Sequence, residues 1–347
     1  MTRRRLLLAA CSATIAIATA GVVIPQIASY GSIWRAVAGL RLGWIAVLLA
    51  VAAANVVTFA LPWMVALSGL SFLNALQLTQ ASTAFTLVVP GGAPLGMGAS
   101  FAMLRSWGFP RAAVARAVAL TGVWNQLSTF LFPVVAALAL AAEGSGGGTV
   151  NLIALGAALV FLVACVLIGL AFYRRDVLSF LVSAVQALLG LLARARRRVR
   201  RRWTREDVES FRSETLGNLR ADWPTLTVAT LSNQLTAYAL LDLSVRAVGI
   251  DLREVNVAET FAAWSLARLL ASLPLTPGGL GFVELGLTGM LVGFGGPNAK
   301  VVAAVLVYRV LSIVPTTLLG LVAFATWNRF RPDGGDGRGS HVVEPRA

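Results

Sequence analysis

The sequence predicts an all-α fold, a polytopic membrane helix bundle that contains two re-entrant hairpins and is built as an inverted repeat. The first indication is composition, because 57% of the 347 residues are hydrophobic, 13% are charged and the mean hydropathy is +0.78. Such values favour several membrane-spanning helices over a soluble core. The second is a pair of Pro- and Gly-rich interruptions, at residues 88–96 and 273–284, inside apolar regions. The third is the placement of arginines at the ends of apolar segments, which is typical of cytoplasmic loops.

The two interruptions share a Pro-Gly-Gly core that is followed closely by a further glycine. Proline removes a backbone donor, and glycine permits the positive φ angles that a turn after a broken helix needs. Each core lies twenty residues before a second proline (110 − 90 and 297 − 277), and a long apolar helix follows in both copies. Paired interruptions in two halves are typical of transporter binding sites, and the equal spacing disfavours two unrelated loops. The predicted turn residues are Pro90, Gly91, Gly92, Pro277, Gly278, Gly279 and Gly281.

The first half of the chain is predicted to cross the membrane repeatedly. Residues 6–28 follow three arginines and form too long an apolar stretch for a signal peptide, so we expect a first span that starts in the cytoplasm. Residues 42–67 cross back, with a kink at Pro62. Residues 72–107 form the first hairpin. Further crossings are expected at residues 112–142 and 150–172.

The middle of the chain, residues 174–222, is predicted to be a cytoplasmic segment that is basic and amphipathic. Arginines flank both ends of residues 177–193, which favours a helix at the membrane interface, although the length would also allow a crossing. The arginine-rich run from Arg194 to Arg202 either binds anionic lipid headgroups or only fixes the topology. Residues 204–222 have the periodicity of an amphipathic surface helix.

The second half completes a single transmembrane domain, residues 1–330, which a disordered cytoplasmic tail follows at residues 331–347. Its expected elements are a crossing at 224–248, a helix at 256–276 that leads into the second hairpin, and a last long helix at 299–327. Three crossings then separate the two hairpins, and an odd number places them on opposite faces of the membrane. The repeat halves would cover about residues 72–142 and 257–327, with both termini in the cytoplasm.

The residue inventory excludes several classes of enzyme site. The single histidine, His341, lies in the polar tail, and Cys11 and Cys165 lie in apolar stretches. Neither a Cys/His metal site nor a histidine-dependent triad is therefore expected, and the sequence has no Walker-type loop, so we expect no metal and no cofactor. The net charge of +14 indicates membrane lipids rather than nucleic acid as the partner, because the arginines flank hydrophobic segments.

Three charged residues in apolar surroundings are candidates for a functional site. Glu284 directly follows the second interruption, and its alternative role is to stabilise a helix N-terminus. Arg309 lies deep in the last helix, where a charge costs about 2.5–3.5 kcal/mol. Arg268 precedes the second turn, and it either binds a lipid phosphate or snorkels to the interface. We predict that these side chains line one polar cavity that holds a lipid headgroup.

The stretch Thr276-Pro277-Gly278-Gly279-Leu280-Gly281-Phe282-Val283-Glu284, with Arg309 on the next long helix, resembles the lysylphosphatidylglycerol synthase transmembrane (flippase-like) family. That family shows Pro-Gly-Gly-Leu-Gly, then a glutamate, then an arginine, so the resemblance implies functional roles for Glu284 and Arg309. It spans roughly residues 5–330. In the first half, the family's charged positions hold uncharged residues, and the polar Asn125 and Gln126 are the remaining candidates for substrate binding. The soluble aminoacyl-transferase domain of the lipid-lysylating members has no counterpart here, so lipid lysylation by this chain alone is not expected.

The resemblance implies a protein of the cytoplasmic membrane that translocates, or flips, a lipid or a lipid-linked anionic headgroup and is not an enzyme. The alternative is a polytopic glycosyl- or acyl-transferase that uses a polyprenyl-linked donor. Such enzymes need an acidic base, usually in an external loop. The first external loop, residues 29–41, holds no acidic residue, and only Asp251 and Glu254 are available in a short later loop. The sequence therefore disfavours the enzyme.

Overall fold

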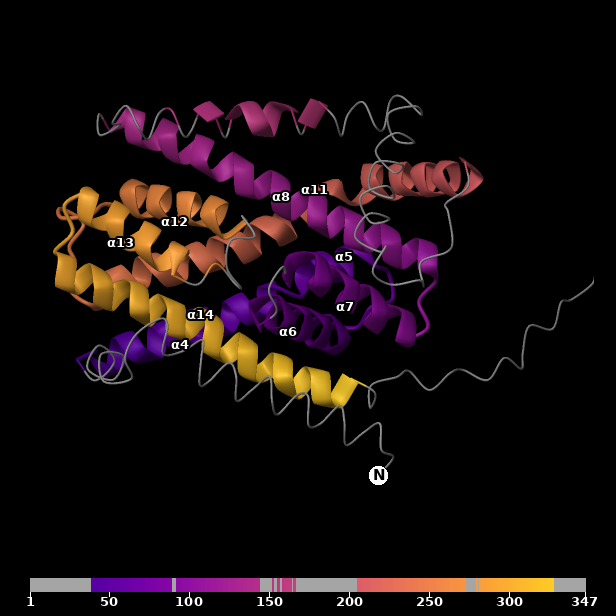
Figure 1. The fold of residues 1–347 in the computed structure, drawn as a ribbon, viewed down its shortest axis with the longest axis horizontal. Helices are drawn as coiled ribbons and strands as arrows, with labels where there is room; N and C mark the ends of the chain where they lie inside the picture. The colour runs from indigo at the N-terminus through magenta and orange to yellow at the C-terminus, as the bar shows by residue number, and fades with distance from the viewer. Residues whose placement is uncertain are drawn as a thin grey trace, which may run out of the picture.

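The computed structural model describes residues 39–88, 92–143, 205–272, 279 and 281–327, together with helical pieces at 152, 155–156, 158–163 and 165–166. Within these ranges the regular elements are helices, which confirms the all-α prediction (Figure 1). The predictions for residues 6–28, 177–193, 194–202 and 331–347 lie outside the described residues, as does much of the crossing expected at 150–172.

The N-terminal half contains α4 (Leu42–Thr58), α5 (Leu61–Ala66), α6 (Phe72–Val88), α7 (Gly92–Ser106) and α8 (Arg111–Ala142). The expected kink near Pro62 is a break between two helices, because α4 ends at Thr58 and α5 begins at Leu61. Pro62 lies in the first turn of α5, where its missing N–H leaves no helical hydrogen bond unmade. Helix α8 begins directly after Pro110.

The C-terminal half contains α11 (Arg205–Ala247), α12 (Val257–Ser272), α13 (Phe282–Gly293) and α14 (Asn298–Thr326). The prediction of separate helices at 204–222 and 224–248 is wrong, because α11 continues through Pro224. A proline inside a helix is tolerated where neighbouring groups satisfy the backbone that it frees. Asn256 caps α12: its Oδ1 accepts the N–H of Glu259 at 2.8 Å, and its own N–H donates to Glu259 Oε2 at 2.8 Å.

Three stretches of the described chain are long and apolar enough to cross a membrane, namely Leu42–Ala66, Arg111–Ala142 and Asn298–Thr326. They coincide with three of the crossings expected from the sequence. Helix α11 is not among them, although a crossing was expected in its second half. Its buried positions include Thr230, Gln234 and Ser244, which lower its hydropathy and give the interior of the bundle a polar helix.

Two helical hairpins, α6–α7 and α12–α13, occupy the two halves, and each packs against the long helix of the other half. Helix α6 lies along α14, and α12 lies along α8 (Figure 1). At the open end of the first hairpin, Trp107 Nε1 donates to the Trp327 carbonyl at 3.4 Å, just past the C-terminus of α14. At the open end of the second, Asn256 Nδ2 donates to Glu143 Oε2 at 2.8 Å, at the C-terminal end of α8. The long helices α8 and α14 thus connect the two halves.

Each half has its own hydrophobic core. One core gathers buried residues of α5 to α8, and the other gathers residues of α11 to α14 around Trp264. Phe132 carries α8 into the second core, where its ring lies 5.3 Å from that of Trp264 and 5.7 Å from that of Phe261. Many large apolar side chains stay exposed, among them Leu138 and Leu285, as expected of surfaces that face lipid tails.

Candidate functional site

The centre of the candidate site is an ion pair between the second hairpin and the last long helix. Arg309 Nε on α14 lies 2.5 Å from Glu284 Oε1 on α13. The second carboxylate oxygen, Oε2, accepts the backbone N–H of Gly281 at 2.7 Å. The side chains are 9% and 13% exposed, so the pair is largely removed from solvent. Two residues that are 25 positions apart in the sequence are therefore direct partners.

The glycines of the second turn place Glu284 at its position. Gly281 precedes the first residue of α13 and has φ +83°, a left-handed conformation that side chains rarely adopt. Gly279 has φ +69°, and a Cβ atom there would lie 2.8 Å from Val283 Cγ2. Because Gly281 is the N-cap of α13, Glu284 lies in the first turn, and its carboxylate can accept the backbone N–H of Gly281. Both glycines have the positive φ angles that the sequence predicted for a turn, and their role in a re-entrant hairpin stays a prediction.

The other predicted turn residues are only partly visible. Pro277 and Gly278 lie outside the described residues, as do Pro90 and Gly91 in the first hairpin. Gly92 is the first residue of α7. Helix α6 ends at Val88 and α7 begins at Gly92, so the predicted turn lies between two helices.

The guanidinium of Arg309 has more donors than the carboxylate of Glu284 satisfies. Arg309 is 7% exposed, and its Nη2 is buried without a hydrogen-bond partner among the described residues. A buried donor of a charged group is costly to leave unpaired. The site therefore presents an N–H donor that an acceptor from a ligand or from water can satisfy.

A second polar group lies between the halves and includes Arg268, Asn125 and Gln234. Asn125 Oδ1 on α8 accepts Gln234 Nε2 at 2.7 Å and Arg268 Nη2 at 3.4 Å. The guanidinium of Arg268 also lies 5.7 Å from the ring centre of Trp264, within the range of a cation–π contact. In the described part of the chain, Arg268 Nε and Gln234 Oε1 are buried and unpartnered. Arg268 therefore also keeps a donor available.

The structure joins some of the predicted site residues and separates others. Glu284 and Arg309 form one pair, whereas Arg268 bonds Asn125, and within the described ranges no hydrogen bond links it to the ion pair. Gln126 is half-buried and takes no part in the described network.

Gln234 is a site residue that the sequence reasoning missed. It is 2% exposed at the centre of α11 and holds the amide of Asn125. Its signal in the sequence was a glutamine in the middle of an expected crossing, a position where polar side chains are costly and usually have a role. Across the described ranges, no group of three His, Cys, Asp or Glu residues gathers into a metal site. The chemistry of this region is therefore that of guanidinium and amide groups.

A family model described as Lysylphosphatidylglycerol synthase TM region matches residues 11–320 of the sequence. The match covers most of the chain and confirms the resemblance that the turn before Glu284 and the position of Arg309 indicated. None of the curated proteins matches the sequence significantly.

Proposed function

The chain belongs to the lysylphosphatidylglycerol synthase TM family and is a multi-pass membrane protein, and we propose that it translocates a lipid, or a lipid-linked anionic headgroup, across the bilayer. The observation that carries the proposal is that Arg309 on α14 and Arg268 on α12 each have a buried N–H donor without a partner among the described residues. Guanidinium groups bind phosphate through two parallel hydrogen bonds. An anionic headgroup would supply the missing acceptors.

Charge balance supports an anionic headgroup over a cationic one. Glu284 is the carboxylate bonded to this region, and Arg309 already holds it. In the empty state Glu284 balances Arg309, and Arg268 keeps a net positive charge beside the amide of Asn125. A bound phosphate would neutralise Arg268 and compete with Glu284 for Arg309. The acyl or prenyl chains would stay in the bilayer while the headgroup occupies the polar region.

We also propose that the hairpins are re-entrant and that the halves form an inverted repeat. The packing supports this, because α6 lies along α14 and α12 lies along α8, an exchange that a pseudo-two-fold axis would generate. The open ends of the hairpins contact the C-terminal ends of different long helices, at Trp327 and at Glu143. Rocking of one half against the other would then expose the headgroup site to each side of the membrane in turn.

The orientation follows from the arginines. We propose that both termini are cytoplasmic and that the run from Arg194 to Arg202 binds anionic headgroups of the same leaflet, as its charge favours. We propose translocation without a covalent step, because the carboxylate of the site is held by Arg309 and by the Gly281 N–H rather than presented as a base.

The test is translocation of labelled lipids by the purified protein in liposomes. Fluorescent phosphatidylglycerol, phosphatidylethanolamine and a polyprenyl phosphate are each placed in both leaflets, and a membrane-impermeant quencher reports exchange. We expect faster exchange than in empty liposomes for at least one of the three lipids, and a loss of that rate in Arg268→Gln. The matched control is Arg253→Gln, an exposed arginine in the loop before α12. Rates equal to empty liposomes for all lipids would contradict the proposal.

A further inference from the structure

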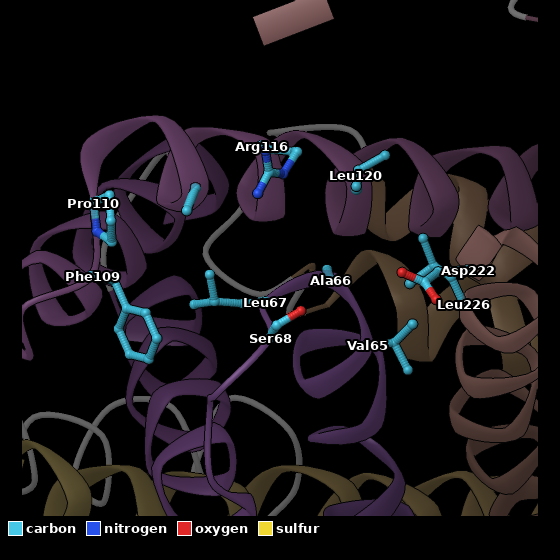
Figure 2. Close-up of a pocket in the computed structure, with 11 residues that line it drawn as sticks. Val65, Ala66, Leu67, Ser68, Phe109, Pro110, Arg116, Leu120, Asp222 and Leu226 are labelled. Atoms are coloured by element: carbon cyan, nitrogen blue, oxygen red, sulfur yellow. The ribbon is translucent and has the colours of Figure 1, made fainter. Parts of the chain in front are cut away.

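A cavity of about 120 Å³ is lined by a set of residues that includes neither Arg268 nor Arg309. Its walls come from α5, the N-terminal part of α8 and the middle of α11, and they include Leu67, Leu120 and Leu226 (Figure 2). Ser68 and Asp222 are exposed, so the cavity opens to the surface. It is smaller than the roughly 300–1,000 Å³ of pockets that hold drug-sized ligands. The space therefore suits a small polar group, not a whole lipid.

Two opposite charges line this cavity. Arg116 projects from α8, and Asp222 projects from α11. Figure 2 shows Arg116 and Asp222 on different walls, separated in this view by Leu120, with Ser68 on the wall that faces Arg116. A cation, an anion and a hydroxyl therefore surround one apolar-walled space. Such an arrangement matches a ligand that itself carries both signs of charge, because a purely anionic group would meet Asp222 and a purely cationic group would meet Arg116.

The cavity lies where the chain is expected to meet the cytoplasmic membrane surface. Arg111 and Arg116 begin α8 next to it, and arginines of this kind mark cytoplasmic ends of helices. Trp223, which directly follows Asp222, is 54% exposed, as tryptophans at a membrane–water interface commonly are. A lipid headgroup in the cytoplasmic leaflet would therefore be at the depth of the cavity.

We propose that this cavity binds a net-neutral headgroup that carries one phosphate and one primary ammonium, as in a phosphoethanolamine group. The phosphate lies against Arg116 and Ser68, the ammonium lies against Asp222, and the apolar wall covers the carbons that join them. This inference goes beyond the proposed translocation function, because it assigns to the surface cavity a net-neutral headgroup that differs from the anionic headgroup proposed for Arg268 and Arg309. Binding here is measurable without any transport, so the two proposals can fail separately.

The test is titration of the purified full-length protein in micelles with dihexanoyl phosphatidylethanolamine and dihexanoyl phosphatidylglycerol. We expect the ethanolamine lipid to bind up to about five-fold more tightly, the range of an exposed ion pair. Asp222→Asn should bring the ratio of the two affinities close to one. Arg116→Gln should weaken both lipids about equally, by about ten-fold, because a charge-assisted hydrogen bond to phosphate is lost. Asp251→Asn, which changes an exposed carboxylate between α11 and α12 that does not line the cavity, should leave the ratio unchanged.

Two further arms identify the source of the headgroup and exclude the Glu284–Arg309 ion pair as the cause of the preference between the two lipids. If free phosphoethanolamine competes for the cavity as well as the short-chain lipid does, the ligand of the site is a soluble molecule. If it competes more weakly, the ligand is a lipid. The preference should persist in Glu284→Gln/Arg309→Gln. Equal binding of the two lipids by the wild type, or an unchanged ratio in Asp222→Asn, would overturn the inference. A preference without transport would instead contradict only the proposed translocation.

Discussion

Arg309→Gln removes the positive charge that balances Glu284 inside the bundle, and we expect it to be among the most destabilising single changes in the protein. The pair is largely buried, with side chains 9% and 13% exposed and an Nε–Oε1 distance of 2.5 Å. Neutralising one partner leaves the other as an uncompensated buried charge, which costs about 3–5 kcal/mol in buried pairs. Glu284→Gln should cost a similar amount for the same reason. The glutamine can still accept the Gly281 N–H, so the turn itself should persist.

The double variant Glu284→Gln/Arg309→Gln separates this electrostatic effect from a general loss of packing. Two neutral amides can hydrogen-bond each other, so the double variant should be more stable than the sum of the single losses predicts. Residues in direct contact show coupling energies of about 0.5–3 kcal/mol, and we expect a value in the upper half of that range. The measurement is denaturant-induced unfolding of the four proteins in mixed micelles. Arg253→Gln, an exposed control, should change the free energy of unfolding by at most about 0.5 kcal/mol.

Additive losses would refute this reasoning. If the double variant is destabilised by the sum of the single changes, with a coupling below about 0.5 kcal/mol, Glu284 and Arg309 are not energetic partners. The alternative account would then apply, in which Glu284 only stabilises the N-terminus of α13.

Three further predictions concern stability and the second polar group. Gly281→Ala should lower the free energy of unfolding by about 1–2 kcal/mol because φ is +83°. The control, Gly289→Ala, should be neutral or stabilising because no atom lies within 4 Å of the new Cβ. Equal thermal stabilities of the two variants would contradict the requirement for a left-handed turn. Gly320→Ala should separate α6 from α14, because its Cβ would lie 2.4 Å from the Gln80 carbonyl, and an unchanged unfolding temperature would show that the helices do not pack so closely. Gln234→Ala should weaken lipid binding a few-fold, because the side chain of Asn125 that Arg268 contacts loses its second hydrogen bond. Unaltered binding would show that Gln234 does not contribute to the site.

The starts of α8 and α14 could be predicted because local rules determine them. Proline before α8 and α14, at Pro110 and Pro297, marks both helix starts, and these boundaries agree with the sequence reasoning to within one residue. The sequence predicted that Glu284 lies near Arg309 and Arg268, because charges in apolar helices need partners, but it did not predict which arginine pairs with Glu284. The positive φ angles of Gly279 and Gly281 likewise follow from a turn that must reverse a broken helix.

The continuity of α11 and the partners of Arg268 could not be predicted in the same way. The rule that a helix ends before proline failed at Pro224, because packing against neighbouring helices overrides local preference. Arg268 meets Asn125 and Gln234 from two other helices, and the periodicity of one helix carries no information about which residues of another helix face it. Packing between helices therefore determined the part of the site that sequence patterns missed.

The most direct test of the central claim is lipid translocation by the double variant Glu284→Gln/Arg309→Gln, after its folded state has been established by the unfolding measurements. The protein is reconstituted in liposomes with the labelled lipid that the wild type exchanges fastest, and the exchange rates are compared at equal protein content. Because the double variant retains the fold but lacks the charged pair that meets the headgroup, we predict an exchange rate equal to that of empty liposomes. A rate equal to that of the wild type would contradict the claim that Glu284 and Arg309 form the translocation site.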